Sequence, residues 1–137
     1  MDDISKEQIL AKKSNVSQEQ IDYIVQLYSQ GQLEKTLVET NKLLNQFPES
    51  VTLYNIQGAS NAGLQNYDAA IESYRKAISI KPNFAEAYNN MGVAQQNKAD
   101  FIGAIESYKQ ATKINPNYAE AYNNLAKALI NRKNYKQ

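Results

Sequence analysis

The sequence contains no cysteine and no histidine among its 137 residues. Without cysteine there is no disulfide bond, no thiolate nucleophile and no zinc site built on sulfur. Without histidine the chain lacks the commonest general base and the commonest zinc ligand. These two absences exclude most familiar catalytic and metal-binding sites. We therefore predict that the protein is not an enzyme and holds no cofactor or metal.

The sequence also lacks an excess of either charge. Lys and Arg number 15, Asp and Glu number 14, and the net charge is +1. Nucleic-acid binding requires clustered positive charge, so we expect no nucleic-acid partner. Long apolar runs are missing as well: no stretch approaches the roughly 18 consecutive apolar residues of a membrane span, and residues 1–13 have no apolar segment typical of a signal peptide. We expect a cytoplasmic protein with no membrane partner.

What the sequence does contain is an internal repeat with a period of about 34 residues, a length typical of helical repeat arrays. The block Ala-Glu-Ala-Tyr-Asn-Asn at Ala85–Asn90 recurs unchanged at Ala119–Asn124. Other identities at the same offset are Ala70/Ala104, Ile71/Ile105, Tyr74/Tyr108, Ala77/Ala111 and Pro82/Pro116. A fixed period of this kind indicates a solenoid, in which each unit buries its apolar face against its neighbours.

Within one unit the pattern predicts two antiparallel helices. Tyr88, Met91, Gly92 and Gln95 fall at positions i, i+3, i+4 and i+7, which is the spacing of one helix face. The proline at the end of each unit disfavours helix at the residue before it and so ends the second helix.

Asparagine and aspartate predict where the helices begin. Asn83 and Asn117 each stand three residues ahead of a glutamate, a variant of the capping box, and should cap the first helices of their units. Two further caps are expected for second helices, at Asn66 and Asp100.

The set of recurring positions resembles the tetratricopeptide repeat family. That family has an aromatic residue, Leu-Gly, Tyr, Ala, an aromatic residue, Ala and Pro at set places along a repeat of this length. The corresponding residues of one unit are Tyr54, Gly58, Tyr67, Ala70, Tyr74, Ala77 and Pro82. Those of the next are Tyr88, Met91-Gly92, Phe101, Ala104, Tyr108, Ala111 and Pro116. The resemblance runs from Ser17 to the end and implies an all-α fold, a right-handed superhelical solenoid of antiparallel helix pairs.

This resemblance divides the chain into units. We predict a divergent first unit over 17–50, regular units over 51–84 and 85–118, and a partial fourth unit over 119–137 that has only its first helix. Residues 1–16 are predicted to form an N-terminal capping helix. The first unit diverges because Thr36 replaces the small alanine and Thr40 replaces the aromatic residue. The tyrosines at repeat positions are expected in the core, filling space between units.

In this family the first helices of successive units line a concave groove that binds an extended peptide or partner segment. The resemblance therefore implies a protein-protein interaction scaffold. Side-chain amides offer donors and acceptors that match the main chain of a peptide. The predicted peptide-binding residues are Tyr28, Asn55, Asn89, Asn90, Gln96, Asn123, Asn124 and Lys127. The open alternative is that the asparagines are solvated surface.

One subclass of the family binds the C-terminal carboxylate of chaperones through a clamp of Lys, Asn and Arg. The corresponding positions here carry Ile21, Asn55, Glu86 and Asn89, so we expect no such clamp. The amide-rich groove is more similar to that of repeat arrays fused to bacterial sugar-transferring enzymes. This similarity suggests the N-terminal array of a larger bacterial protein.

Two other functions compete with peptide binding. The first is self-association end to end through the open fourth unit, where Leu125, Leu129 and Tyr135 should lack cover within the chain and form an apolar patch. This predicts a homodimer at high concentration. The second is an enzyme that uses paired carboxylates. The candidate acids are spread along helix starts and outer faces, which argues against it: Asp68, Glu72, Asp100 and Glu106.

Overall fold

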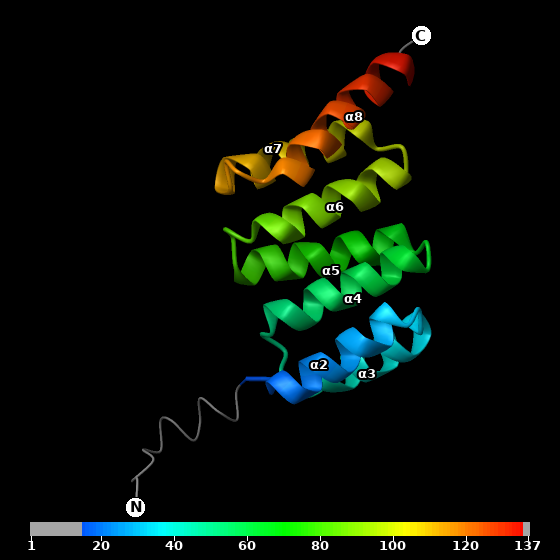
Figure 1. The fold of residues 1–137 in the computed structure, drawn as a ribbon, viewed down its shortest axis with the longest axis vertical. Coiled ribbons are helices and arrows are strands. Elements are labelled where there is room, and N and C mark those ends of the chain that lie inside the picture. Colours follow the sequence, from blue (N-terminus) through cyan, green and yellow to red (C-terminus); the bar gives the residue numbers. More distant parts are fainter. Residues whose placement is uncertain (1–14, 136–137) are drawn as a thin grey trace, which may run out of the picture.

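The computed structural model describes residues 15–135, and these residues form seven helices and no strand. The helices are α2 (Gln18–Ser29), α3 (Leu33–Gln46), α4 (Val51–Gly63), α5 (Tyr67–Ile80), α6 (Ala85–Asn97), α7 (Phe101–Ile114) and α8 (Ala119–Tyr135). They stack along one long axis, with α2 near one end and α8 at the other (Figure 1). The predicted all-α solenoid of antiparallel helix pairs is confirmed. The predicted N-terminal capping helix lies almost wholly outside the described residues.

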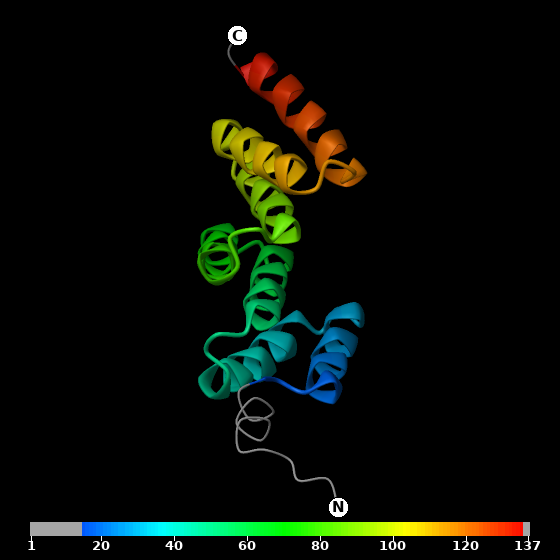
Figure 2. The same cartoon turned by 90° about the vertical axis from the view of Figure 1, so that its left-hand side faces the viewer.

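Contacts between helices show which face of the solenoid is the inner one. Each helix packs against the next along the chain, and α2, α4, α6 and α8 also contact one another in turn. No such contact joins α3, α5 and α7 to one another in the part of the chain that the structure describes. The even-numbered helices are therefore closer together and form the inner face, while the odd-numbered helices lie outside (Figure 2). No helix within residues 15–135 is long and apolar enough to cross a membrane.

The regular helix pairs are locked by a glycine packed against a tyrosine ring. A Cβ atom at Gly58 would lie 2.5 Å from Cε1 of Tyr74, and one at Gly92 would lie 2.5 Å from Cε1 of Tyr108. Both rings are buried, so each ring occupies the space that a larger side chain on the facing helix would need. The tyrosines thus fill space within a helix pair, although Tyr74 also packs against Met91 of the following helix.

The first helix pair is also closely packed, but the large and the small side chain have exchanged helices. Ile24 stands one repeat before Gly58, and Thr40 stands one repeat before Tyr74. Both side chains are fully buried. The large residue is therefore on the first helix of this pair and the small one on the second, which explains how a unit without the aromatic residue still packs.

The turn between the two helices of each pair needs one residue in the left-handed backbone region. These residues follow one another at the repeat spacing: Gly31 has φ 75°, Gln65 has φ 64° and Ala99 has φ 65°. Glycine adopts this conformation freely, whereas a side chain makes it costly. The fold imposes the conformation on Gln65 and Ala99, because the turn reverses the chain onto the outer layer.

The predicted helix caps are partly wrong. Asn83 does not cap α6: the residue before the helix is Phe84, so Asn83 lies one position too early to reach the first free amides. Asn117 likewise lies two residues ahead of Ala119, where α8 begins. Asn66 makes no capping hydrogen bond, but the Asp100 side chain accepts one from the Gly103 amide at 3.0 Å.

Candidate functional site

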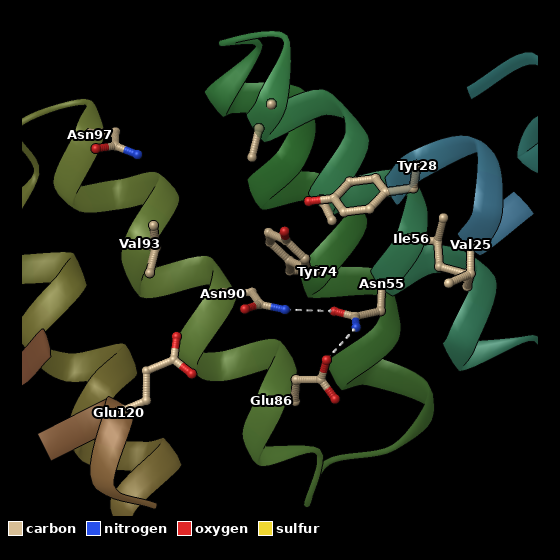
Figure 3. A pocket seen from close by; sticks show the side chains of 13 residues that line it. Val25, Tyr28, Asn55, Ile56, Tyr74, Glu86, Asn90, Val93, Asn97 and Glu120 are labelled. Carbon is tan, nitrogen blue, oxygen red and sulfur yellow. Dashed lines mark hydrogen bonds between the residues drawn. The ribbon is translucent and has the colours of Figure 1, made fainter. Parts of the chain in front are cut away.

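The inner face of the solenoid carries an open pocket of about 570 Å³. It is lined mainly by residues of α2, α4 and α6, with Glu120 of α8 at one side and the largely buried Tyr74 of α5 contributing to the wall (Figure 3). Apolar side chains such as Ile56 and Val93 alternate with the polar side chains of Asn55 and Asn90. A pocket of this size and mixed lining suits a side chain or short segment of a partner.

Two asparagines and a glutamate form a hydrogen-bonded chain across this pocket. Asn90 Nδ2 donates to Asn55 Oδ1 at 3.2 Å, and Asn55 Nδ2 donates to Glu86 Oε1 at 3.2 Å. These bonds link α4 to α6, and Figure 3 shows all three side chains at the pocket surface. The side-chain carbonyl oxygen of Asn90, Oδ1, accepts no hydrogen bond from another of the described residues, so it can accept one from a ligand.

The same asparagine pair recurs one repeat later with a different exposure. Asn124 Nδ2 donates to Asn89 Oδ1 at 3.1 Å, and the sequence separation of 35 matches that of Asn90 and Asn55. Asn89 is 0% exposed, however, and its Nδ2 has no partner among the described residues. The expectation that Asn89 faces the groove openly is wrong, because Asn124 and α8 cover it.

Four other predicted site residues lie away from the pocket. Gln96 Oε1 accepts a hydrogen bond from the Tyr108 hydroxyl at 2.8 Å, so it is directed toward α7. Asn124 is half-buried against Asn89, and Asn123 and Lys127 are exposed on α8. None of these four lines the pocket. The structure brings together Tyr28, Asn55 and Asn90 from the predicted set.

Two glutamates that were not predicted as site residues line the same pocket. Glu86 and Glu120 stand one repeat apart and occupy the same place in the repeated Ala-Glu-Ala-Tyr block. Both stand in the first turn of an inner helix. Their recurrence on the helices predicted to line the groove was the signal that could have identified them.

The glutamates influence the tyrosine hydroxyls around the inner face. Burial raises the pKa of Tyr74, and the nearby Tyr28 and Glu86 raise it further. Burial also raises the pKa of Tyr118; Glu120 and Glu86 add to the effect, and the Asn89 side chain opposes it. These hydroxyls therefore stay protonated at neutral pH.

The apolar surface at α8 is smaller than predicted. Leu125 does not lack cover: it is half-buried against the core formed by Ala104, Ile105, Tyr108 and Ala128. Leu129 is 46% exposed and Tyr135 is 75% exposed, although the Tyr135 ring lies 4.9 Å from the Phe101 ring, centre to centre. An exposed apolar strip therefore remains on α8.

Two of the acids considered for catalysis have other roles. Asp68 forms an ion pair with Lys98, and Asp100 caps α7. No group of three or more Asp or Glu residues capable of holding a metal occurs within residues 15–135. The lack of enzymatic activity stays a prediction.

Comparison with known proteins shows which sequences and structures this chain is similar to. A sequence model of the TPR repeat matches residues 63–98 and 100–131. The first TPR domain of human RPAP3, solved by NMR, superposes with a TM-score of 0.83 at 18% identity, covering 85% of this chain and 92% of that one. The MamA protein gives 0.79 at 23% identity, covering 93% and 69%.

Some of the similar structures contain a bound peptide. The first TPR of Spaghetti (RPAP3), bound to the HSP90 peptide SRMEEVD, has a TM-score of 0.77 at 19% identity and covers 80% of this chain and 86% of that one. No curated protein sequence matches the chain. With its regular repeat period, its stacked helix pairs and the sequence match over residues 63–98 and 100–131, the chain belongs to the TPR repeat family.

Proposed function

We propose that this protein is an interaction scaffold that binds an extended peptide or partner segment along the inner face of α2, α4, α6 and α8. The observation that supports this most is the pocket at Asn55 and Asn90, which is open and combines apolar walls with amide groups that can make further hydrogen bonds. The first TPR of Spaghetti (RPAP3) is bound to an HSP90 peptide, so a domain with this fold can accommodate a short peptide.

The pocket offers two kinds of contact to a peptide. The amides of Asn55 and Asn90 have donors and an acceptor left for main-chain groups, since each makes only one or two hydrogen bonds within the chain. Ile56 and Val93 provide apolar surface for a side chain. Main-chain hydrogen bonds would supply affinity, and the apolar walls would restrict which side chains fit.

We propose to test this with peptides selected from a random nonapeptide library against the 137-residue chain. Asn55→Ala combined with Asn90→Ala should weaken their binding roughly tenfold to thirtyfold, because each lost hydrogen bond costs on the order of 1 kcal/mol. The double variant removes both partners of one hydrogen bond, and the exposed Glu86 carboxylate, which loses the bond from Asn55, can be hydrated instead. The melting temperature should therefore change little while the affinity, measured by titration calorimetry, falls.

A second amide pair provides a matched control. Gln57 Nε2 donates to Asn41 Oδ1 at 2.8 Å, and these residues line a different depression. Asn41→Ala combined with Gln57→Ala should leave peptide affinity unchanged. Equal losses in the two double variants, or no loss in either, would contradict binding through the inner-face amides.

We propose self-association through α8 as a second candidate function. Ile130 is 60% exposed and Leu129 is 46% exposed on the same helix, which leaves an apolar strip open to solvent. We expect dimers at high protein concentration and expect Ile130→Lys to abolish them. Sedimentation velocity decides this: a strict monomer at about millimolar concentration, unchanged by the substitution, would rule out the proposal.

A further inference from the structure

The pocket on the inner face contains negative charge that no residue of the described chain neutralises. Glu86 and Glu120 both line it, whereas no Lys or Arg does. The two ion pairs within residues 15–135 join Lys42 to Glu39 and Lys98 to Asp68, so neither pocket glutamate takes part in one. The chain as a whole is nearly neutral, which makes this local imbalance a property of the pocket.

The two carboxylates approach the pocket from different helices. Glu86 lies in the first turn of α6 and accepts a hydrogen bond from Asn55. Glu120 lies in the first turn of α8 and extends toward the same space from its other side (Figure 3). A glutamate in the first turn stabilises its own helix through the helix dipole. Stabilisation of its own helix does not explain why both glutamates line one pocket that contains no Lys or Arg. Two uncompensated carboxylates in one pocket favour a positively charged ligand.

An aromatic ring lines the other side of the pocket, across the Asn55–Asn90 pair from the two glutamates (Figure 3). Tyr28 of α2 is 40% exposed, and its side chain reaches over the pocket near Tyr74 (Figure 3). The face of a tyrosine ring attracts an ammonium or guanidinium group within about 6 Å of its centre. The chain already uses this contact elsewhere, where Lys76 Nζ lies 5.7 Å from the centre of the Tyr54 ring.

We infer that the pocket selects a partner segment that carries a lysine or arginine side chain, with its cation at the carboxylates of Glu86 and Glu120. This inference rests on the proposed function and specifies its partner. Free amides at Asn55 and Asn90 hold the neighbouring main chain, and Ile56 and Val93 contact the aliphatic part of the side chain. A peptide ending in acidic residues would meet two carboxylates and no cation here.

A metal ion suits the site less well than an organic cation. Metal sites usually need three or more protein ligands, and no group of three or more such acidic residues exists in the part of the chain that the structure describes. Two carboxylates on separate helices fit a flat or extended cation better.

The experiment is selection of a random nonapeptide library displayed on phage against the full 137-residue chain, followed by calorimetry with the selected peptides. We expect enrichment of Lys and Arg, and an affinity loss of about tenfold when the enriched cation is replaced by glutamine. Glu86→Gln combined with Glu120→Gln should give a similar loss. Raising NaCl from about 50 to about 500 mM should weaken wild-type binding and affect that variant much less.

The chain offers a control with the same change in net charge. Glu72 and Glu106 also stand one repeat apart, but they are exposed on the outer helices α5 and α7. Glu72→Gln combined with Glu106→Gln should change affinity less than about twofold, since long-range interactions of exposed charges are screened.

The outcomes separate this inference from the function on which it rests. Suppose that the selected peptides are neutral or acidic and lose affinity for the Asn55/Asn90 double variant but not for the Glu86/Glu120 double variant. This result would contradict selection of a cationic side chain and would still support peptide binding along the inner face. Peptides unaffected by either double variant would overturn both. Tighter binding of the acidic peptide SRMEEVD than of the selected peptides would also overturn the inference.

Discussion

Replacing Gly92 with isoleucine is expected to destabilise the protein by about 3 kcal/mol or more, because overpacking a rigid core typically costs about 1–3 kcal/mol and here the obstacle is an immobile ring. Even a Cβ atom at Gly92 would lie 2.5 Å from Tyr108 Cε1. The Tyr108 ring is fully buried and its hydroxyl donates to Gln96, so it has no space into which to move. Urea denaturation monitored by circular dichroism measures the loss.

The first helix pair indicates how this substitution can be rescued. There the large Ile24 and the small Thr40 stand two repeats before Gly92 and Tyr108, respectively, and both are fully buried. Gly92→Ile combined with Tyr108→Thr should therefore be more stable than the sum of the two single losses by roughly 2 kcal/mol, a coupling within the range for residues in contact.

A matched control lies one repeat further on. Ala126 stands one repeat after Gly92 and is exposed on α8. Ala126→Ile should change stability by no more than about 0.5 kcal/mol, as surface substitutions usually do. A Gly92→Ile protein that unfolds at the same urea concentration as the wild type would show that the glycine and tyrosine are not packed as described.

Asn89→Ala is expected to cost about 1–3 kcal/mol of stability, whereas Asn123→Ala should change it by less than about 0.5 kcal/mol. The two residues occupy the same place in identical six-residue blocks. Asn89 is fully buried and accepts the hydrogen bond from Asn124. Removing its side chain therefore leaves a void and takes the acceptor away from Asn124 Nδ2. Asn123 is exposed and makes no side-chain hydrogen bond within the described residues.

Thermal unfolding of the two variants under identical conditions tests this difference. Equal melting temperatures would mean that Asn89 is not held as the structure shows. A larger loss for Asn89→Ala would establish that asparagine bonds between α6 and α8 stabilise the inner face. The equivalent bond between α4 and α6 lies in the open pocket, so the same interaction serves packing in one repeat and a candidate binding surface in the other.

The fold was predictable because the sequence repeats itself. The identical blocks at Ala85–Asn90 and Ala119–Asn124 fix the period, and the period with its helical spacing fixes the helix pairs. The helix starts were less predictable. Asn83 has the right chemistry for a cap, but the turn after Pro82 extends one residue further than the capping-box pattern assumes, and Phe84 takes the position.

The sequence predicted the location of the candidate site better than it predicted the residues that line it. Tyr28, Asn55 and Asn90, which inner-face periodicity predicted as binding residues, line the pocket. That periodicity could not predict that Asn55 is partly exposed while Asn89 is buried, because the two residues stand one repeat apart at equivalent positions. Their exposure depends on how closely the next inner helix covers each residue. The role of Glu86 depends equally on a bond to Asn55, which lies in the preceding repeat.

Binding of a peptide along the inner face is the central claim, and mapping the contact surface tests it most directly. A selected peptide is titrated into ¹⁵N-labelled protein while the backbone amide resonances are followed. We expect the largest shifts at Asn55, Ile56, Asn90 and Val93 on α4 and α6, with the exposed residues of α5 and α7 nearly unchanged. Shifts confined to the outer helices, or none at saturating peptide, would contradict the claim.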